Sequence, residues 1–81
     1  CGSAGSFLEA ARSKDCDLLV TGETSFHTCL EAEATDMALL LPGHYASERF
    51  AVEILADVLA EQFPGIDVWA SRDEADPLKW L

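Results

Sequence analysis

The 81-residue chain contains few basic residues. Five lysines and arginines stand against fifteen acidic residues, which gives a net charge of −10. Binding nucleic acid through its phosphates requires a basic patch, so this composition argues against a nucleic-acid partner. No signal peptide is visible in these residues, and no apolar run comes near the roughly 20 residues that span a bilayer. We therefore expect a cytoplasmic protein without a membrane partner.

Cysteine is also scarce. There are three, Cys1, Cys16 and Cys29, and no two of them are spaced as C-x-x-C. An odd number without this spacing argues against a disulfide framework and a thiolate zinc site, and it suits a reducing compartment. Cys1 and Cys29 have no neighbour in the sequence that would stabilise a thiolate, so we expect them to be small packing residues.

Apolar residues are plentiful, at 49% of the chain, which is typical of a folded domain. Their periodicity predicts alternating elements: helices over 7–14, 25–35 and 45–63, and strands over 17–21, 37–41 and 66–70. This order favours one α/β unit over 1–81, with a mostly parallel sheet and helices on both faces. Residues 71–81 are expected to form a polar tail. Cys1-Gly2 resembles the end of an earlier strand, so we expect the chain to be a piece of a longer protein.

Three polar motifs follow apolar strands. A glycine-rich loop follows the expected earlier strand, Thr21-Gly22-Glu23 follows the next strand, and Gly43-His44 follows the third. Ligands of open parallel sheets bind outside the carboxyl ends of the strands, so we expect the three motifs to meet at one edge.

His44 and Glu48 are candidate metal ligands. They are four residues apart at the start of a predicted helix, so their side chains share one face. Imidazole nitrogen and carboxylate oxygen together suit zinc, iron or manganese. The alternative is an ordinary first helical turn in which Glu48 complements the helix dipole.

Glu23 and His27 form a second candidate pair, also four residues apart. Glu23 is suited to accept a proton or orient a water, and His27 to act as a ligand, an acid–base group or a donor to substrate. The alternative is an acid near a helix start and a half-buried helix histidine.

The loop containing Gly2, Ser3 and Gly5 is a candidate anion or substrate site, because it offers backbone N–H groups at a helix start. It matches neither the dinucleotide fingerprint nor the P-loop, whose lysine it lacks. The alternative is a turn that serves only to reverse the chain.

Taken in order, these motifs resemble one family. The most specific element is Gly43-His44-Tyr45-x-Ser47-Glu48-Arg49, and it follows the Thr21 and Cys1-Gly2 motifs at matching spacing. The chain is similar to the C-terminal part of the dinuclear-metal proteins known as GTP cyclohydrolase 1 type 2 homologues, the NGG-interacting-factor-like family. The resemblance covers nearly all 81 residues.

The resemblance implies that His44 and Glu48 are ligands to two divalent metal ions, with Glu48 able to bridge them. The other ligands, a His-His pair and an Asp, would come from an N-terminal half outside this chain. Glu23, His27 and the Gly2–Gly5 loop would line the cleft beside the metals. The full-length protein would form homohexamers of α/β subunits and act on a small-molecule substrate.

Our leading hypothesis is therefore the C-terminal segment of a metal-dependent hydrolase of nucleotide-like or cyclic-amide substrates. The main alternative is a non-catalytic oligomerising or partner-binding module with a structural metal or none. The acidic surface, Trp69 and Trp80 motivate this alternative. A nucleotide-binding α/β piece that uses the glycine loop ranks last, because the fingerprint residues are missing.

Overall fold

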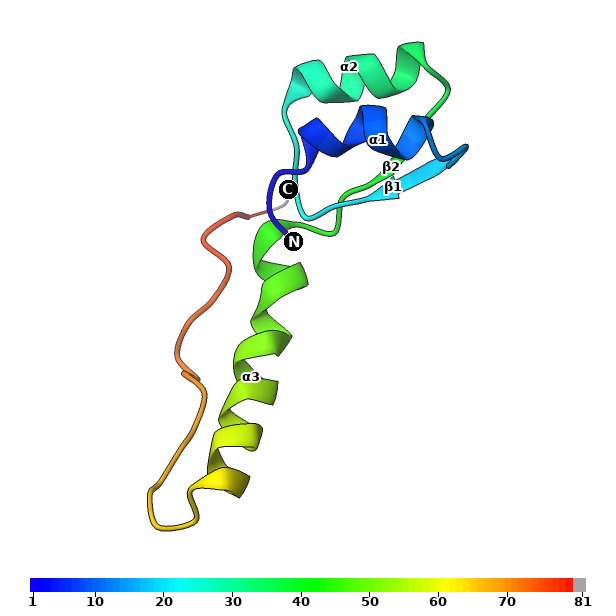
Figure 1. Ribbon diagram of the computed structural model, residues 1–81. Coiled ribbons are helices and arrows are strands. Elements are labelled where there is room, and N and C mark those ends of the chain that lie inside the picture. The colour runs from blue at the N-terminus through cyan, green and yellow to red at the C-terminus, as the bar shows by residue number, and fades with distance from the viewer. Residues whose placement is uncertain (80–81) are drawn as a thin grey trace. The chain divides into compact units, whose positions relative to one another are not determined.

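The computed structural model describes residues 1–79, and it has the alternating order typical of an α/β protein. The elements are a 3-10 helix η1 (Gly5–Phe7), α1 (Leu8–Arg12), β1 (Leu18–Val20), α2 (Phe26–Ala34), β2 (Ala38–Leu40) and α3 (His44–Gln62) (Figure 1). The chain divides into two compact units, Cys1–Ser47 and Glu48–Leu81. The boundary between them falls inside α3.

The first unit is built around a parallel strand pair. β1 and β2 pair in the register Leu18↔Ala38, Leu19↔Leu39 and Val20↔Leu40, and α2 forms the crossover between them. Backbone hydrogen bonds extend the pairing beyond both strands, since Ala38 N donates to Asp17 O and Thr21 N donates to Leu40 O. Short apolar runs bounded by glycine or proline predicted both strands, and the α/β class is confirmed.

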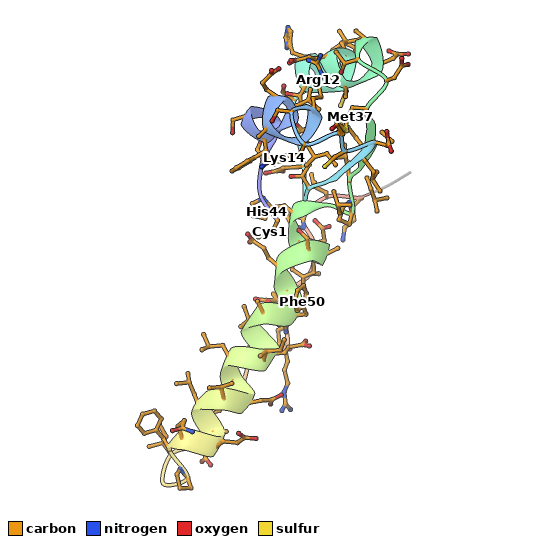
Figure 2. The ribbon with its side chains drawn as sticks, turned by 45° about the vertical axis from the view of Figure 1, so that its right-hand side comes forward. Cys1, Arg12, Lys14, Met37, His44 and Phe50 are labelled. Carbon is orange, nitrogen blue, oxygen red and sulfur yellow. The ribbon has the colours of Figure 1, made fainter. Side chains whose placement is uncertain are left out.

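The core of this unit lies between the strands and two helices. Leu8 of α1, Ala32 of α2 and Met37 are buried, and Leu19 and Leu39 pack against them from the strands. Figure 1 shows α1 and α2 on the same side of the strand pair, and Figure 2 shows Met37 between helices and strands. Alternation along each strand thus directs its central leucine into the core.

The opposite face of the strand pair is apolar and exposed. Leu18, Val20 and Leu40 expose half or more of their surface. Their near-continuous apolar sequence is typical of strands buried on both faces, so helices over this second face remain a prediction.

Local chemistry ends the helices where the sequence predicts turns. Ser25 caps α2, its Oγ accepting a hydrogen bond from Thr28 N at 3.2 Å. Asp15 and Asp36, which follow α1 and α2, adopt left-handed conformations with φ of 55° and 54°. Aspartate tolerates this region better than most residues. Gly43, immediately before α3, has φ of 97°, which favours glycine.

The second unit consists of most of α3 and the segment that follows it. No residue of α3 is buried, although its apolar side chains recur with helical spacing. Ile54, Leu55 and Val58 each expose about half of their surface or more. Within residues 1–79, no helix is both long and apolar enough to cross a membrane.

The strand predicted over 66–70 is wrong. This segment follows the turn at Pro64-Gly65, and residues 67–70 have no regular secondary structure. A strand requires a neighbouring strand to accept its backbone hydrogen bonds, and none pairs with this segment in the described part of the chain. Its alternating sequence therefore leaves Ile66 and Trp69 exposed. Residues 71–79 also form no helix or strand, and Trp80 lies outside the described residues.

All three cysteines are free. Cys29 is half-buried on α2, in agreement with a packing role, but Cys1 and Cys16 are exposed. The packing role predicted for Cys1 is therefore wrong: the residue lies at the edge of the first unit, outside its core.

Candidate functional site

The glycine-rich loop and the motif after β1 are joined by backbone hydrogen bonds. Gly2 O accepts from Glu23 N at 3.1 Å and from Thr21 Oγ1 at 2.9 Å. Ser3 and Glu23 form a parallel bridge. The loop thus runs parallel to the segment that follows β1. The earlier strand expected to end at Cys1-Gly2 stays a prediction.

The motif after β2 joins the same edge. Gly43 N donates to Gly22 O at 2.9 Å, and Ser47 N in the first turn of α3 donates to Gly43 O. Gly22 is buried where these segments cross, and a Cβ added there would lie 2.9 Å from both Gly2 N and Ser47 Oγ. The crossing therefore requires glycine, and the three strand-end motifs meet as their positions predict.

This convergence brings Glu23 to His44. Glu23 Oε1 lies 2.8 Å from His44 Nδ1, within hydrogen-bond distance, although the residues are 21 positions apart. Both side chains are about half exposed. The imidazole lies at the start of α3, near Cys1 (Figure 2). Its Nδ1 is engaged by a carboxylate, an arrangement that orients histidines that bind metals through Nε2.

Glu48, the second candidate ligand, lies four residues after His44 in the same helix and is exposed. Within residues 1–79, no group of three or more histidine, cysteine or acidic side chains could hold a metal ion. The ligand assignment of His44 and Glu48 therefore stays a prediction about part of a site.

His27 lies on a different element, α2, and takes no part in the contact between Glu23 and His44. It is exposed on the first turn of α2, so the half-buried histidine considered as an alternative is wrong. The carboxylate of Glu23, which the sequence grouped with His27, contacts His44 instead. Spacing alone does not predict the Glu23–His44 pair, but the position of both residues after adjacent parallel strands does indicate it.

The glycine-rich loop has structural reasons for its glycines. Gly2 has φ of 75°, and a Cβ on Gly5 would lie 2.7 Å from Thr28 Oγ1 on α2. Both positions thus favour glycine for conformation or packing, which supports the alternative of a chain reversal. Binding of an anion or substrate by Gly2, Ser3 and Gly5 remains a prediction.

Comparison with known proteins gives a consistent result over most of the chain. A family model described as Duf34/NIF3 (NGG1p interacting factor 3) matches residues 1–77. A GTP cyclohydrolase 1 type 2 homolog of Neisseria meningitidis is 38% identical over 94% of this chain and 30% of its own length. The Protein NIF3 homolog of Schizosaccharomyces pombe is 38% identical over 93% of this chain and 29% of its own length.

A third relative, the GTP cyclohydrolase 1 type 2 homolog of Haemophilus influenzae, is 31% identical over 83% of this chain and 26% of its own length. The chain thus spans less than a third of the length of these relatives. No solved structure matches it significantly.

Proposed function

The chain belongs to the Duf34/NIF3 family, and we propose that it supplies part of the site for two divalent metal ions in a metal-dependent hydrolase. His44 and Glu48 act as ligands, and the remaining ligands come from outside residues 1–81. The proposed substrates are nucleotide-like or cyclic-amide compounds, in keeping with the name cyclohydrolase in the bacterial relatives. The activity proposed is that of the whole protein.

The contact between Glu23 and His44 carries this proposal. A carboxylate at 2.8 Å from Nδ1 directs Nε2 of the same ring toward a ligand, which is the usual arrangement around a metal-binding histidine. The donor set also fits, since imidazole nitrogen with carboxylate oxygen suits zinc, iron or manganese. Both His44 and Glu48 are exposed.

The chemistry follows from the donors. Bound divalent ions supply Lewis-acid activation of water for hydrolysis. In the proposed site, Glu23 holds the His44 ring, Glu48 adds negative charge one helical turn away, and the backbone at Gly22 and Gly43 fixes the segments that carry Glu23 and His44.

Metal titration of the whole protein that contains residues 1–81 tests the ligand assignment. Calorimetry with zinc and manganese on chelator-treated protein should show at least about tenfold weaker binding for His44→Ala and for Glu48→Ala, because each removes a direct ligand, and even the loss of an outer partner typically weakens metal binding by about 10–100-fold. His27→Ala and Glu61→Ala are matched controls and should bind as the unaltered protein does, since His27 lies on α2 and Glu61 near the end of α3. Unchanged binding in the His44 and Glu48 variants would refute the assignment.

A hydrolase assay tests the activity. The whole protein that contains residues 1–81, loaded with metal, should hydrolyse members of a panel of phosphoesters, nucleotides and cyclic amides. The rate should fall when a chelator is added and return with the metal. No turnover with zinc, iron or manganese would instead favour the alternative below.

The second candidate function is a non-catalytic oligomerising or partner-binding module. The exposure of Trp69, at 68%, and of the apolar side chains of α3 favours it. We propose a homohexamer as the assembled state in either case. Light scattering after size-exclusion chromatography, with and without chelator, should give the molar mass of six copies. Assembly in the presence of chelator, together with no turnover, would support this second function.

A further inference from the structure

We propose that Glu23 is a positioning residue that selects the ring nitrogen with which His44 binds metal. Oε1 of Glu23 would accept a hydrogen bond from Nδ1–H, which would leave Nε2 of the same ring to bind the ion. This inference rests on the proposed function, because it requires His44 to be a ligand. It adds a role for a residue that does not itself contact the ion.

The geometry around Glu23 supports a fixed acceptor. Its backbone is held on one side by the hydrogen bond from Glu23 N to Gly2 O and by the parallel bridge to Ser3. Thr21 Oγ1, buried two residues earlier, donates to the same Gly2 carbonyl at 2.9 Å. The carboxylate therefore extends from a backbone with little freedom to move.

The backbone before His44 is fixed to the same point. Gly43 N donates to Gly22 O at 2.9 Å, and Gly22 directly precedes Glu23. The absence of a side chain on Gly22 allows Gly2 and Ser47 to approach this crossing. Glu23 and His44 therefore each directly follow a glycine of this backbone hydrogen bond. The fold thus sets the 2.8 Å contact between their side chains without a bound ligand.

The charge on Glu23 matters as well as its position. A carboxylate that accepts from Nδ1–H increases the basicity of the imidazole and holds the ring in one orientation. Partners of this kind typically change metal affinity by about 10–100-fold when they are removed. An amide at the same place still offers an oxygen acceptor but no charge, so it should retain part of the effect.

Zinc affinity of the whole protein that contains residues 1–81, measured by calorimetry, tests the role. We expect Glu23→Ala to raise the zinc Kd about 10–100-fold and Glu23→Gln to raise it by about tenfold or less. Glu33→Ala, an exposed acid on α2, should leave the Kd unchanged. Circular dichroism confirms that each variant is folded, and the nearly isosteric Gln variant keeps the test valid if the Ala variant does not fold.

Nitrogen NMR of the His44 ring in the zinc-loaded protein gives a second readout that is independent of activity. The unaltered protein should show zinc on Nε2 and a proton on Nδ1, and Glu23→Ala should lose the protection of that proton from solvent exchange. Zinc on Nδ1, or an unchanged Kd in both Glu23 variants, would overturn the positioning role. If His44→Ala itself binds zinc normally, the proposed function fails first, so the two failures are distinguishable.

Discussion

The two units of this chain differ in what holds their backbones in place. In residues 1–47, segments distant in the sequence are joined by strand pairing and by hydrogen bonds at Gly2, Gly22 and Gly43, over a small buried core. In the described part of the second unit, α3 has no buried residue, and its backbone bonds are local. Among the described residues, non-local backbone hydrogen bonds therefore join segments of the first unit, whereas the distant segments of the second unit are joined by side-chain contacts of Arg49.

This difference bears on where the proposed site lies. The Glu23–His44 contact joins residues 21 positions apart, and it depends on three backbone segments that meet with fixed register. Precise placement of functional groups requires such rigid support. The second unit instead exposes apolar side chains at Ile54, Leu55 and Val58, which is typical of a surface that another part of an assembly covers.

The largest effect should come from removing core volume in the first unit. Leu8 is 1% exposed, so Leu8→Ala should lower the free energy of unfolding by about 2–4 kcal/mol, through lost burial and the cavity left behind. Ile54→Ala, at a residue 56% exposed, should cost less than about 1 kcal/mol. Urea denaturation of the full chain measures both. Equal losses would break the comparison, because they would show that Ile54 is as well buried as Leu8.

A smaller loss of stability should follow from adding a side chain at Gly22, where the segments of Gly2 and Ser47 approach closely. The added methyl group of Gly22→Ala would meet Gly2 N and Ser47 Oγ at 2.9 Å, so we expect a loss of about 1–3 kcal/mol from overpacking. Gly65→Ala is the matched control in the second unit, since nothing lies within 4 Å of a Cβ there. Its stability should change by less than about 0.5 kcal/mol. Similar thermal shifts for both variants would contradict the special role of the crossing.

The fold of the first unit was largely predictable because its signals are local. Apolar runs ended by Gly22 and by Pro42-Gly43 predicted both strands, and Ser25 marked the start of α2. The segment 66–70 alternates in the same way but has no strand beside it in the described residues, so the prediction failed there. Alternation reports a preference for extended backbone, whereas a strand also requires a partner that the local sequence does not specify.

The site was predictable in position but not in pairing. Strand ends placed Glu23 and His44 at one edge, and their common location is confirmed. Helical spacing grouped Glu23 with His27 instead, because residues four apart are neighbours only when both lie within a helix. Glu23 precedes α2, which begins at Phe26. Contacts across a sheet edge depend on strand register, and only the fold provides that register.

The smallest effect should come from Arg49, whose contacts hold the C-terminal segment to α3 within the second unit. Its Nε lies 2.8 Å from Glu74 Oε1, and its guanidinium donates to Ser71 O. Nη1 is 3.4 Å from Glu53 Oε1, within ion-pair distance but without hydrogen-bond geometry. The side chain of Arg49 is 19% exposed, whereas Glu74 is 41% exposed, so solvent weakens the pair.

Arg49→Gln should therefore lower the free energy of unfolding by less than about 1 kcal/mol, yet speed hydrogen exchange across residues 71–74. Arg72→Gln, an exposed arginine in the same segment, is the control and should leave exchange unchanged. Faster exchange at 71–74 with unchanged exchange in β1 and β2 would sharpen the contrast between the units. Faster exchange in both strands would contradict it, because the contacts of Arg49 would then also stabilise the first unit.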